Sequence, residues 1–140
     1  VALFTPEHVH HELAHDWFAD HFEDGWATCP ITENGFVRVM SGPAGGGSGL
    51  RAADLVERLQ RFCAGKHHVF WPDAVSLLDA TLFDPRLAGG HRQLTDIYLL
   101  GLSARMEGTL ATFDRTIPIG AVVGATRTTL SVIGVAGSDR

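Results

Sequence analysis

Three carboxylates occupy similar places in the sequence. Glu33 and Asp96 each follow a threonine that can cap the start of a helix, and Asp114 closes the apolar segment TLATF. Alone, each has an ordinary role, because an acid in the first turn of a helix gains about 0.3–1 kcal/mol from the helix dipole and aspartate is common in turns. Together, carboxylates that converge from separate segments repel one another unless a divalent cation neutralises them. We therefore expect Glu33, Asp96 and Asp114 to bind Mg²⁺ or Mn²⁺, which prefer oxygen ligands.

A site of this kind suits the hydrolysis of a phosphodiester bond, because one or two metal ions activate a water molecule and stabilise the leaving oxygen. Arg92 and Arg115 lie close in sequence to two of the acids. Their guanidinium groups could hold the phosphates of an RNA substrate, or they could form surface ion pairs that contribute little to stability. The sequence leaves both interpretations open.

The elements that position these residues follow from the spacing of apolar residues and from turn residues. The pattern predicts helices at 6–22, from 32 onward, and at 50–65, 72–83 and 95–106, with strands at 25–31, 67–71, 109–113 and 128–135. Strands that alternate with helices predict an α/β fold with a mainly parallel sheet. In such a sheet, ligands bind beyond the carboxyl ends of the strands. The three acids are therefore expected at one edge of the sheet.

The segment SGPAGGGSG, residues 41–49, is dominated by glycine. Glycine at this density predicts a flexible loop, because holding it in regular structure has a large entropy cost. A phosphate-binding P-loop would need a Gly-Lys-Ser/Thr ending, and Leu50 and Arg51 follow instead. We expect a linker between two helices.

The composition is that of one globular domain. The chain has 140 residues, of which 45% are hydrophobic, and this is enough for a single core. The net charge of −5 gives no basic surface for non-specific nucleic-acid binding, so RNA would be held by a local patch. Cys29 and Cys63 lack the spacing of a zinc ribbon, and we expect both to be reduced and buried. With no signal sequence and no membrane helix predicted, the expected location is the cytoplasm.

Four sequence blocks occur in an order and spacing that are specific enough to compare with a known family. They are CPITENGFVRVMS, FWPD, GHRQLTDIYLLGLS and GTLATFDRTIP, within a span from Val1 to Pro118. Together they resemble PIN-domain proteins of the VapC type, the ribonuclease toxins of bacterial type II toxin–antitoxin pairs. The resemblance implies an α/β, PIN-like three-layer sandwich, in which helices flank a mainly parallel central sheet, over a single domain of residues 1–140.

The same resemblance implies roles for individual residues. Glu33, Asp96 and Asp114 take the places of three metal-binding acids, with Thr95 as a supporting hydroxyl and Arg38 as the arginine of the Glu33 helix. Members of this family cut RNA with Mg²⁺ or Mn²⁺, pair with a small VapB-type antitoxin that blocks the site, and are commonly dimeric. We therefore expect an RNA substrate, a VapB-type antitoxin and a second copy of this chain as partners, and no membrane.

The start of the sequence departs from the family pattern. The family opens with a strand that ends in an aspartate, and VALF at residues 1–4 resembles the turn after that strand. We therefore expect the first strand and its carboxylate to be missing from this sequence. Loss of a central strand would expose sheet edges and weaken the domain. This leaves open a catalytically impaired PIN remnant that acts only in antitoxin binding or oligomerisation.

The segment HELAH matches the zinc-binding pattern HExxH. On a helix, His11 and His15 would share one face, with Glu12 as a general base. Leu13 and Trp17 are expected to occupy the buried face, which would place both histidines on a solvated flank. The chain also has eight histidines, which raises the odds of a chance match. A zinc metalloprotease is therefore the less favoured alternative.

Overall fold

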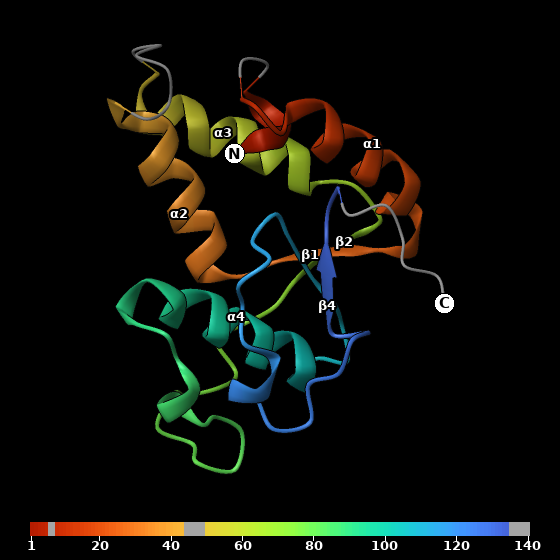
Figure 1. Cartoon of the computed structure of the whole chain (residues 1–140). Helices are drawn as coiled ribbons and strands as arrows, with labels where there is room; N and C mark the ends of the chain where they lie inside the picture. The colour runs from red at the N-terminus through yellow and green to blue at the C-terminus, as the bar shows by residue number, and fades with distance from the viewer. Residues whose placement is uncertain (6–7, 44–49, 135–140) are drawn as a thin grey trace. The chain divides into compact units, whose positions relative to one another are not determined.

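The computed structural model describes residues 1–5, 8–43 and 50–134. The chain divides into two compact units, Val1–Pro72 and Asp73–Arg140, and Figure 1 labels the four described α-helices and most of the strands. Residues 44–49 of the predicted glycine-rich loop, and Pro6 of the first predicted helix, lie outside the described residues. Each unit is described by itself.

The first unit combines helices with a parallel pair of strands. Its described elements are η1 (Ala2–Phe4), α1 (His11–His21), η2 (Phe22–Asp24), β1 (Trp26–Thr28), α2 (Pro30–Ser41), α3 (Ala52–Cys63) and β2 (His68–Phe70). Strands β1 and β2 run parallel, with Trp26 opposite His68 and Thr28 opposite Phe70. The strands predicted at 25–31 and 67–71 are therefore present, each within its predicted range.

Helix α2 begins earlier than predicted. Pro30 occupies the first helical position, where its fixed φ and missing N–H are favourable. Thr32, the predicted N-cap, lies further inside the helix, and its hydroxyl accepts the backbone N–H of Cys29 at 2.9 Å. This bond satisfies a donor at the helix start that has no partner within the helix. Glu33 lies in the first turn, as predicted.

The core of the first unit joins α2 and α3 to the N-terminal segment. Its buried cluster consists of Phe36, Met40 and Leu55, with Phe4, Val37 and Leu59 packed against it. The ring centroid of Phe4 lies 5.0 Å from that of Phe36 and 4.8 Å from that of Phe62. Aromatic pairs at this separation add stability beyond the burial of their area. The packing holds the first turn of α2 near the last turn of α3.

Helix α1 is shorter than the predicted helix at 6–22, and its buried face differs. The backbone N–H of His11 donates to the carbonyl of His8, and residues 8–10 form a bend and a turn, so the described residues just before α1 are not helical. Leu13 was predicted to be buried but is 45% exposed, whereas Ala14 is buried. The prediction for Leu13 is therefore wrong, because Ala14 and not Leu13 lies on the buried face of α1.

The second unit contains one buried helix and a second parallel pair of strands. Its described elements are η4 (Pro85–Leu87), η5 (His91–Gln93), α4 (Leu94–Arg105), β3 (Leu110–Thr112), η6 (Ile119–Ala121) and β4 (Leu130–Val132). Strands β3 and β4 run parallel, with Leu110 opposite Leu130 and Thr112 opposite Val132. The helix predicted at 95–106 and the strand predicted at 109–113 are confirmed, and β4 lies within the strand predicted at 128–135, of which residue 135 lies outside the described residues.

Helix α4 forms the centre of the second unit. Ile97 and Leu102 are 1% exposed and Leu100 is fully buried, as expected for a helix that is apolar on most of its surface. Gly101 allows close packing against this helix, because a Cβ at this position would lie 2.2 Å from Cζ of Phe83. The ring of Phe83 therefore packs directly against the backbone of α4.

The helix predicted at 72–83 is absent from the structure, which shows turns in this segment. Oδ1 of Asp79 accepts the backbone N–H and the hydroxyl of Thr81, at 2.9 and 2.6 Å. Oγ of Ser76 accepts the backbone N–H of Leu78 at 3.2 Å. Short polar side chains that bond nearby backbone groups in this way compete with helix formation. The prediction was wrong because it rested on the spacing of apolar residues, which carries no information about these local hydrogen bonds.

The observed architecture is a mixture of helices and short parallel strands, which agrees with the predicted α/β class. The arrangement of both strand pairs in one central sheet, the three-layer sandwich and the single domain stay predictions. Among the described helices, none combines the length and apolar character needed to cross a membrane.

Candidate functional site

Asp96 and Asp114 are brought together in the second unit. Asp96 lies in the first turn of α4, and Asp114 follows the end of β3. Burial raises the pKa of Asp96, and the negative charge of Asp114 raises it further. The two carboxylates are thus close enough to influence each other electrostatically, and their convergence with Glu33 on one metal site stays a prediction. Carboxylate oxygens are the donors that hard divalent cations prefer, and such an ion would relieve the repulsion between these two side chains.

The loop that carries Asp114 is fixed by its neighbours. Oδ1 of Asp114 accepts both the backbone N–H and the hydroxyl of Thr116, each at 2.7 Å. These bonds lower the pKa of Asp114, because they favour the ionised form. Asp114 therefore stays ionised to a lower pH than usual, whereas Asp96 is protonated more easily.

Gln93 connects the loop after β3 to the start of α4. Its Nε2 donates to the backbone carbonyl of Thr116 at 3.0 Å, and its Oε1 accepts the backbone N–H of Gly89 at 2.7 Å. Gln93 immediately precedes α4, whose first turn holds Asp96. Gln93 was not predicted from the sequence. Its signal was weak, since a single glutamine before a helix is common and its partners lie 4 and 23 positions away.

The other residues predicted for this part of the site are at the surface. Thr95 is exposed and lies inside α4, whose N-cap is Gln93, so the prediction that Thr95 caps the helix is wrong. Arg92 and Arg115 are exposed, and within the described part of the chain neither takes part in an ion pair. The surface ion-pair interpretation is therefore not observed for them, and their role toward RNA stays a prediction.

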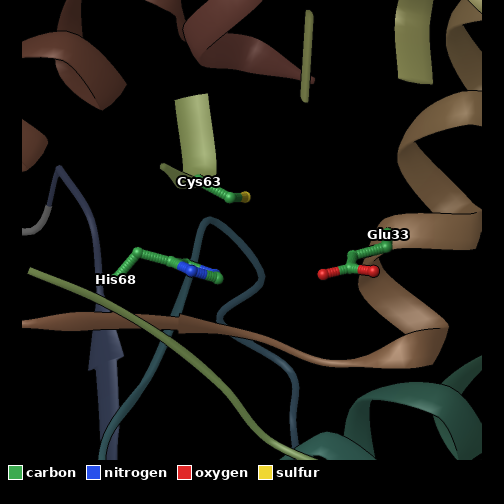
Figure 2. A group of neighbouring side chains, drawn as sticks. All are labelled: Glu33, Cys63 and His68. Atoms are coloured by element: carbon green, nitrogen blue, oxygen red, sulfur yellow. The ribbon is translucent and has the colours of Figure 1, made fainter. Parts of the chain in front are cut away.

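Glu33 lies in the first unit and belongs to a different cluster. The hydroxyl of Thr28 donates to Oε1 of Glu33 at 2.6 Å and lies 2.8 Å from Nε2 of His68. Cys63, the last residue of α3, completes the group. The ligand atoms of Glu33, Cys63 and His68 lie within 4.8 Å of one another, and Figure 2 shows the three side chains converging from different elements. We call this set the Glu–Cys–His cluster.

The cluster opens on a groove between α2 and α3. The groove has a volume of about 580 Å³ and is lined mainly by apolar side chains, with Glu33 and Cys63 among its walls. Burial raises the pKa of the Cys63 thiol, the charge of Glu33 raises it further, and a hydrogen bond with Thr28 lowers it. Cys63 is half-buried and free, whereas Cys29 is free and buried as predicted.

Glu33 was predicted from the sequence, but its partners Thr28, Cys63 and His68 were not. Their meeting depends on the pairing of β1 with β2 and on the packing of α3, which bring together residues 40 positions apart. Arg38 is exposed on α2, and its predicted role stays a prediction. Because the two units are described separately, the joint action of Glu33 with Asp96 and Asp114 is also a prediction.

Among the described residues, the HELAH segment does not form part of a three-ligand group. His11 and His15 lie on α1 with ring centroids 5.2 Å apart, and Nδ1 of His11 is hydrogen-bonded to the carbonyl of Ala2 at 2.6 Å. In the part of the chain that the structure describes, the one group of three clustered metal-ligating side chains is Glu33, Cys63 and His68. The geometry therefore gives the metalloprotease alternative no support.

Comparison with known proteins identifies several relatives in Mycobacterium tuberculosis. The protein named Ribonuclease VapC44, from strain ATCC 25618 / H37Rv, is 40% identical over 133 residues, which cover 95% of this chain and 93% of the relative. Ribonuclease VapC39 of the same strain is 38% identical over 124 residues, 89% of each chain. Ribonuclease VapC38 is 43% identical over 114 residues, 81% of this chain and 79% of the relative.

No family model and no solved structure matches the chain. The relatives nevertheless align with 81–95% of the chain, at 38–43% identity. They confirm the resemblance that the four sequence blocks indicated. This chain belongs to the family of VapC-type PIN ribonucleases.

Proposed function

We propose that this protein is a metal-dependent endoribonuclease toxin that hydrolyses RNA phosphodiester bonds. The observation that supports it most is the meeting of Asp96 and Asp114 at the end of β3, in a chain whose relatives are named ribonucleases. Mg²⁺ or Mn²⁺ is the cofactor that suits this oxygen-donor pair. Glu33 is proposed as the third acid of the same site.

The roles of the residues follow from their positions. Asp96 and Asp114 would hold the metal, and the buried helix α4 keeps Asp96 in place, since its apolar residues are packed behind the first turn. When bound, the metal supplies an activated water molecule and stabilises the leaving oxygen. Arg92 and Arg115, both exposed next to the acids in sequence, would hold RNA phosphates. Thr95 and Arg38 are proposed as supporting residues.

The partners proposed for this toxin are the ones that the family implies. They are a VapB-type antitoxin that covers the acidic site and a second copy of the chain in a homodimer, with the cytoplasm as the location. A partner that blocks the site would have to neutralise or bury Asp96 and Asp114, so a basic segment of the antitoxin is the expected contact.

The test compares RNA ends in cells that express the wild-type chain or its Asp96→Ala variant. New RNA ends are expected with the wild type and not with Asp96→Ala, because the variant loses a metal ligand. The matched control is Asp84→Ala, which removes an acid of the same unit that instead pairs with Arg86 at 2.8 Å. The purified chain should also cut RNA only when Mg²⁺ or Mn²⁺ is added.

Two results would overturn the proposal. One is cleavage by Asp96→Ala at the same positions and rate as the wild type. The other is a folded wild-type chain that cuts no RNA with either metal. The second result would favour the catalytically impaired remnant, which binds its antitoxin or its own copy without hydrolysis.

A further inference from the structure

The Glu–Cys–His cluster contains donors of a kind that the two aspartates do not. It combines a carboxylate oxygen, a thiol sulfur and an imidazole nitrogen in one place. Mg²⁺ does not select sulfur or nitrogen donors, whereas Zn²⁺ binds all three types. We propose that Glu33, Cys63 and His68 form a zinc-binding site in the first unit, separate in its chemistry from the Asp96–Asp114 pair.

The distances within the cluster fit such an ion after small adjustments. In a tetrahedral zinc site the bonds are about 2.0–2.3 Å long, which places donor atoms about 3.3–3.8 Å apart. The three donor atoms of the cluster lie within 4.8 Å of one another. Rotations that move each atom by about 1 Å would therefore close the site. The three residues supply three ligands, and a water molecule would be the fourth.

The residues come from elements that the core of the unit already fixes. Glu33 is in the first turn of α2, Cys63 is the last residue of α3 and His68 is the first residue of β2. Thr28 on β1 joins two of them through one hydroxyl. Partners of this kind orient metal ligands and reduce the entropy lost when the ion binds. The groove lined by Glu33 and Cys63 provides a path for the ion from solvent.

The competing interpretation is a hydrogen-bonded network with no affinity for metal. Thr28 already satisfies Glu33 and His68, so the cluster is stable without an ion. The two interpretations differ in one observable. A network alone binds no zinc, whereas the proposed site binds one zinc ion per chain and uses the thiolate of Cys63 as a ligand.

The experiment measures metal bound to the reduced full chain after dialysis against Zn²⁺, in the absence of RNA. One zinc ion per chain is expected. With Co²⁺ as a spectroscopic substitute, the wild-type chain should show a sulfur-to-metal charge-transfer band. This measurement needs no variant, so it tests the site even if a substitution disturbs folding.

Variants then assign the ligands. Cys63→Ala and His68→Ala should each weaken zinc binding by at least about 100-fold, because losing an outer partner alone typically costs about 10–100-fold. The matched control is His67→Ala, which removes the adjacent histidine whose ring packs 5.5 Å from that of Phe22. His11→Ala tests the HELAH segment. Neither control should change the zinc affinity.

Three outcomes would overturn the inference. They are no zinc bound to the wild-type chain, zinc binding that survives in folded Cys63→Ala, and zinc binding that is lost in His11→Ala instead. None of them depends on ribonuclease activity. Failure of the zinc site and failure of the proposed function are therefore separate results.

Discussion

The two units place acids in similar positions but surround them with different chemistry. Each has a parallel pair of strands and a helix with a single acid in its first turn, Glu33 in α2 and Asp96 in α4. Asp96 meets a second carboxylate, whereas Glu33 meets a thiol and an imidazole. Similar backbone arrangements thus produce a pair of carboxylates, which are hard donors, in the second unit and a mixed set of oxygen, sulfur and nitrogen donors in the first. The side chains that neighbouring elements contribute decide which ion each acid can bind.

The largest effect should appear when zinc and magnesium compete for Glu33, and this prediction depends on both proposals above. If Glu33 serves the RNA site, zinc in the Glu–Cys–His cluster removes it from that site. At ten times its Kd, zinc occupies about 90% of the chains, so RNA cleavage in Mg²⁺ should fall about tenfold. Cleavage rates with and without Zn²⁺ measure the ratio.

The matched comparison is the same ratio in Cys63→Ala, where it should approach one because the sulfur ligand is gone. The ratio of cleavage rates with and without Zn²⁺ is taken within each protein, so a change in the basal cleavage rate of the variant does not affect it. Equal inhibition of the wild type and Cys63→Ala would show that zinc acts elsewhere, for example on the two aspartates.

The next largest effect concerns packing. A glycine-to-alanine substitution should change the free energy of unfolding in opposite directions in the two units. Gly101→Ala should lower the free energy of unfolding by about 1–3 kcal/mol, because the new methyl group overlaps the buried ring of Phe83. Gly35→Ala in α2 has open space around it and should raise stability by about 0.5–1 kcal/mol, since alanine favours a helix. Urea unfolding followed by circular dichroism measures both.

These two variants also separate packing from helix propensity. Alanine should favour the helix at both positions. The difference between the two changes in the free energy of unfolding therefore reports the contact of Phe83 with α4. If Gly101→Ala were as stable as Gly35→Ala, the ring would not lie against the helix backbone as described.

Some of this structure could be predicted from local sequence and some could not. Helix α4 was predicted because apolar residues dominate the segment after Asp96, and the strands after it because β-prone residues fill short segments between turn residues. The helix predicted at 72–83 failed because Ser76 and Asp79 bond nearby backbone groups. The electrostatic interaction of Asp96 with Asp114 agrees with the expectation that acids at the ends of parallel elements share an edge, whereas their sharing of one metal site stays a prediction.

The Glu–Cys–His cluster was not predicted, because no spacing rule joins its members. The sequence predicts only that Cys63 is reduced and buried and that His68 lies in the strand at 67–71. Their contact with Glu33 requires that β2 pairs with β1 so that His68 reaches Thr28. Such a contact is set by strand register and helix packing, which a single sequence specifies only through the whole core.

The smallest effect is a shift in the titration of one carboxyl group, and it tests whether the two aspartates interact. Burial and the charge of Asp114 both raise the pKa of Asp96. Asp114→Asn removes only the charge, so the pKa of Asp96 should fall toward its usual range while the part caused by burial remains. Carboxyl-carbon NMR titration of the metal-free chain measures it, with Asp84→Asn as a control that should leave Asp96 unchanged. An unchanged Asp96 in Asp114→Asn would mean that the carboxylates are too far apart to share an ion, which would remove the main support for the proposed RNA site while leaving the zinc site intact.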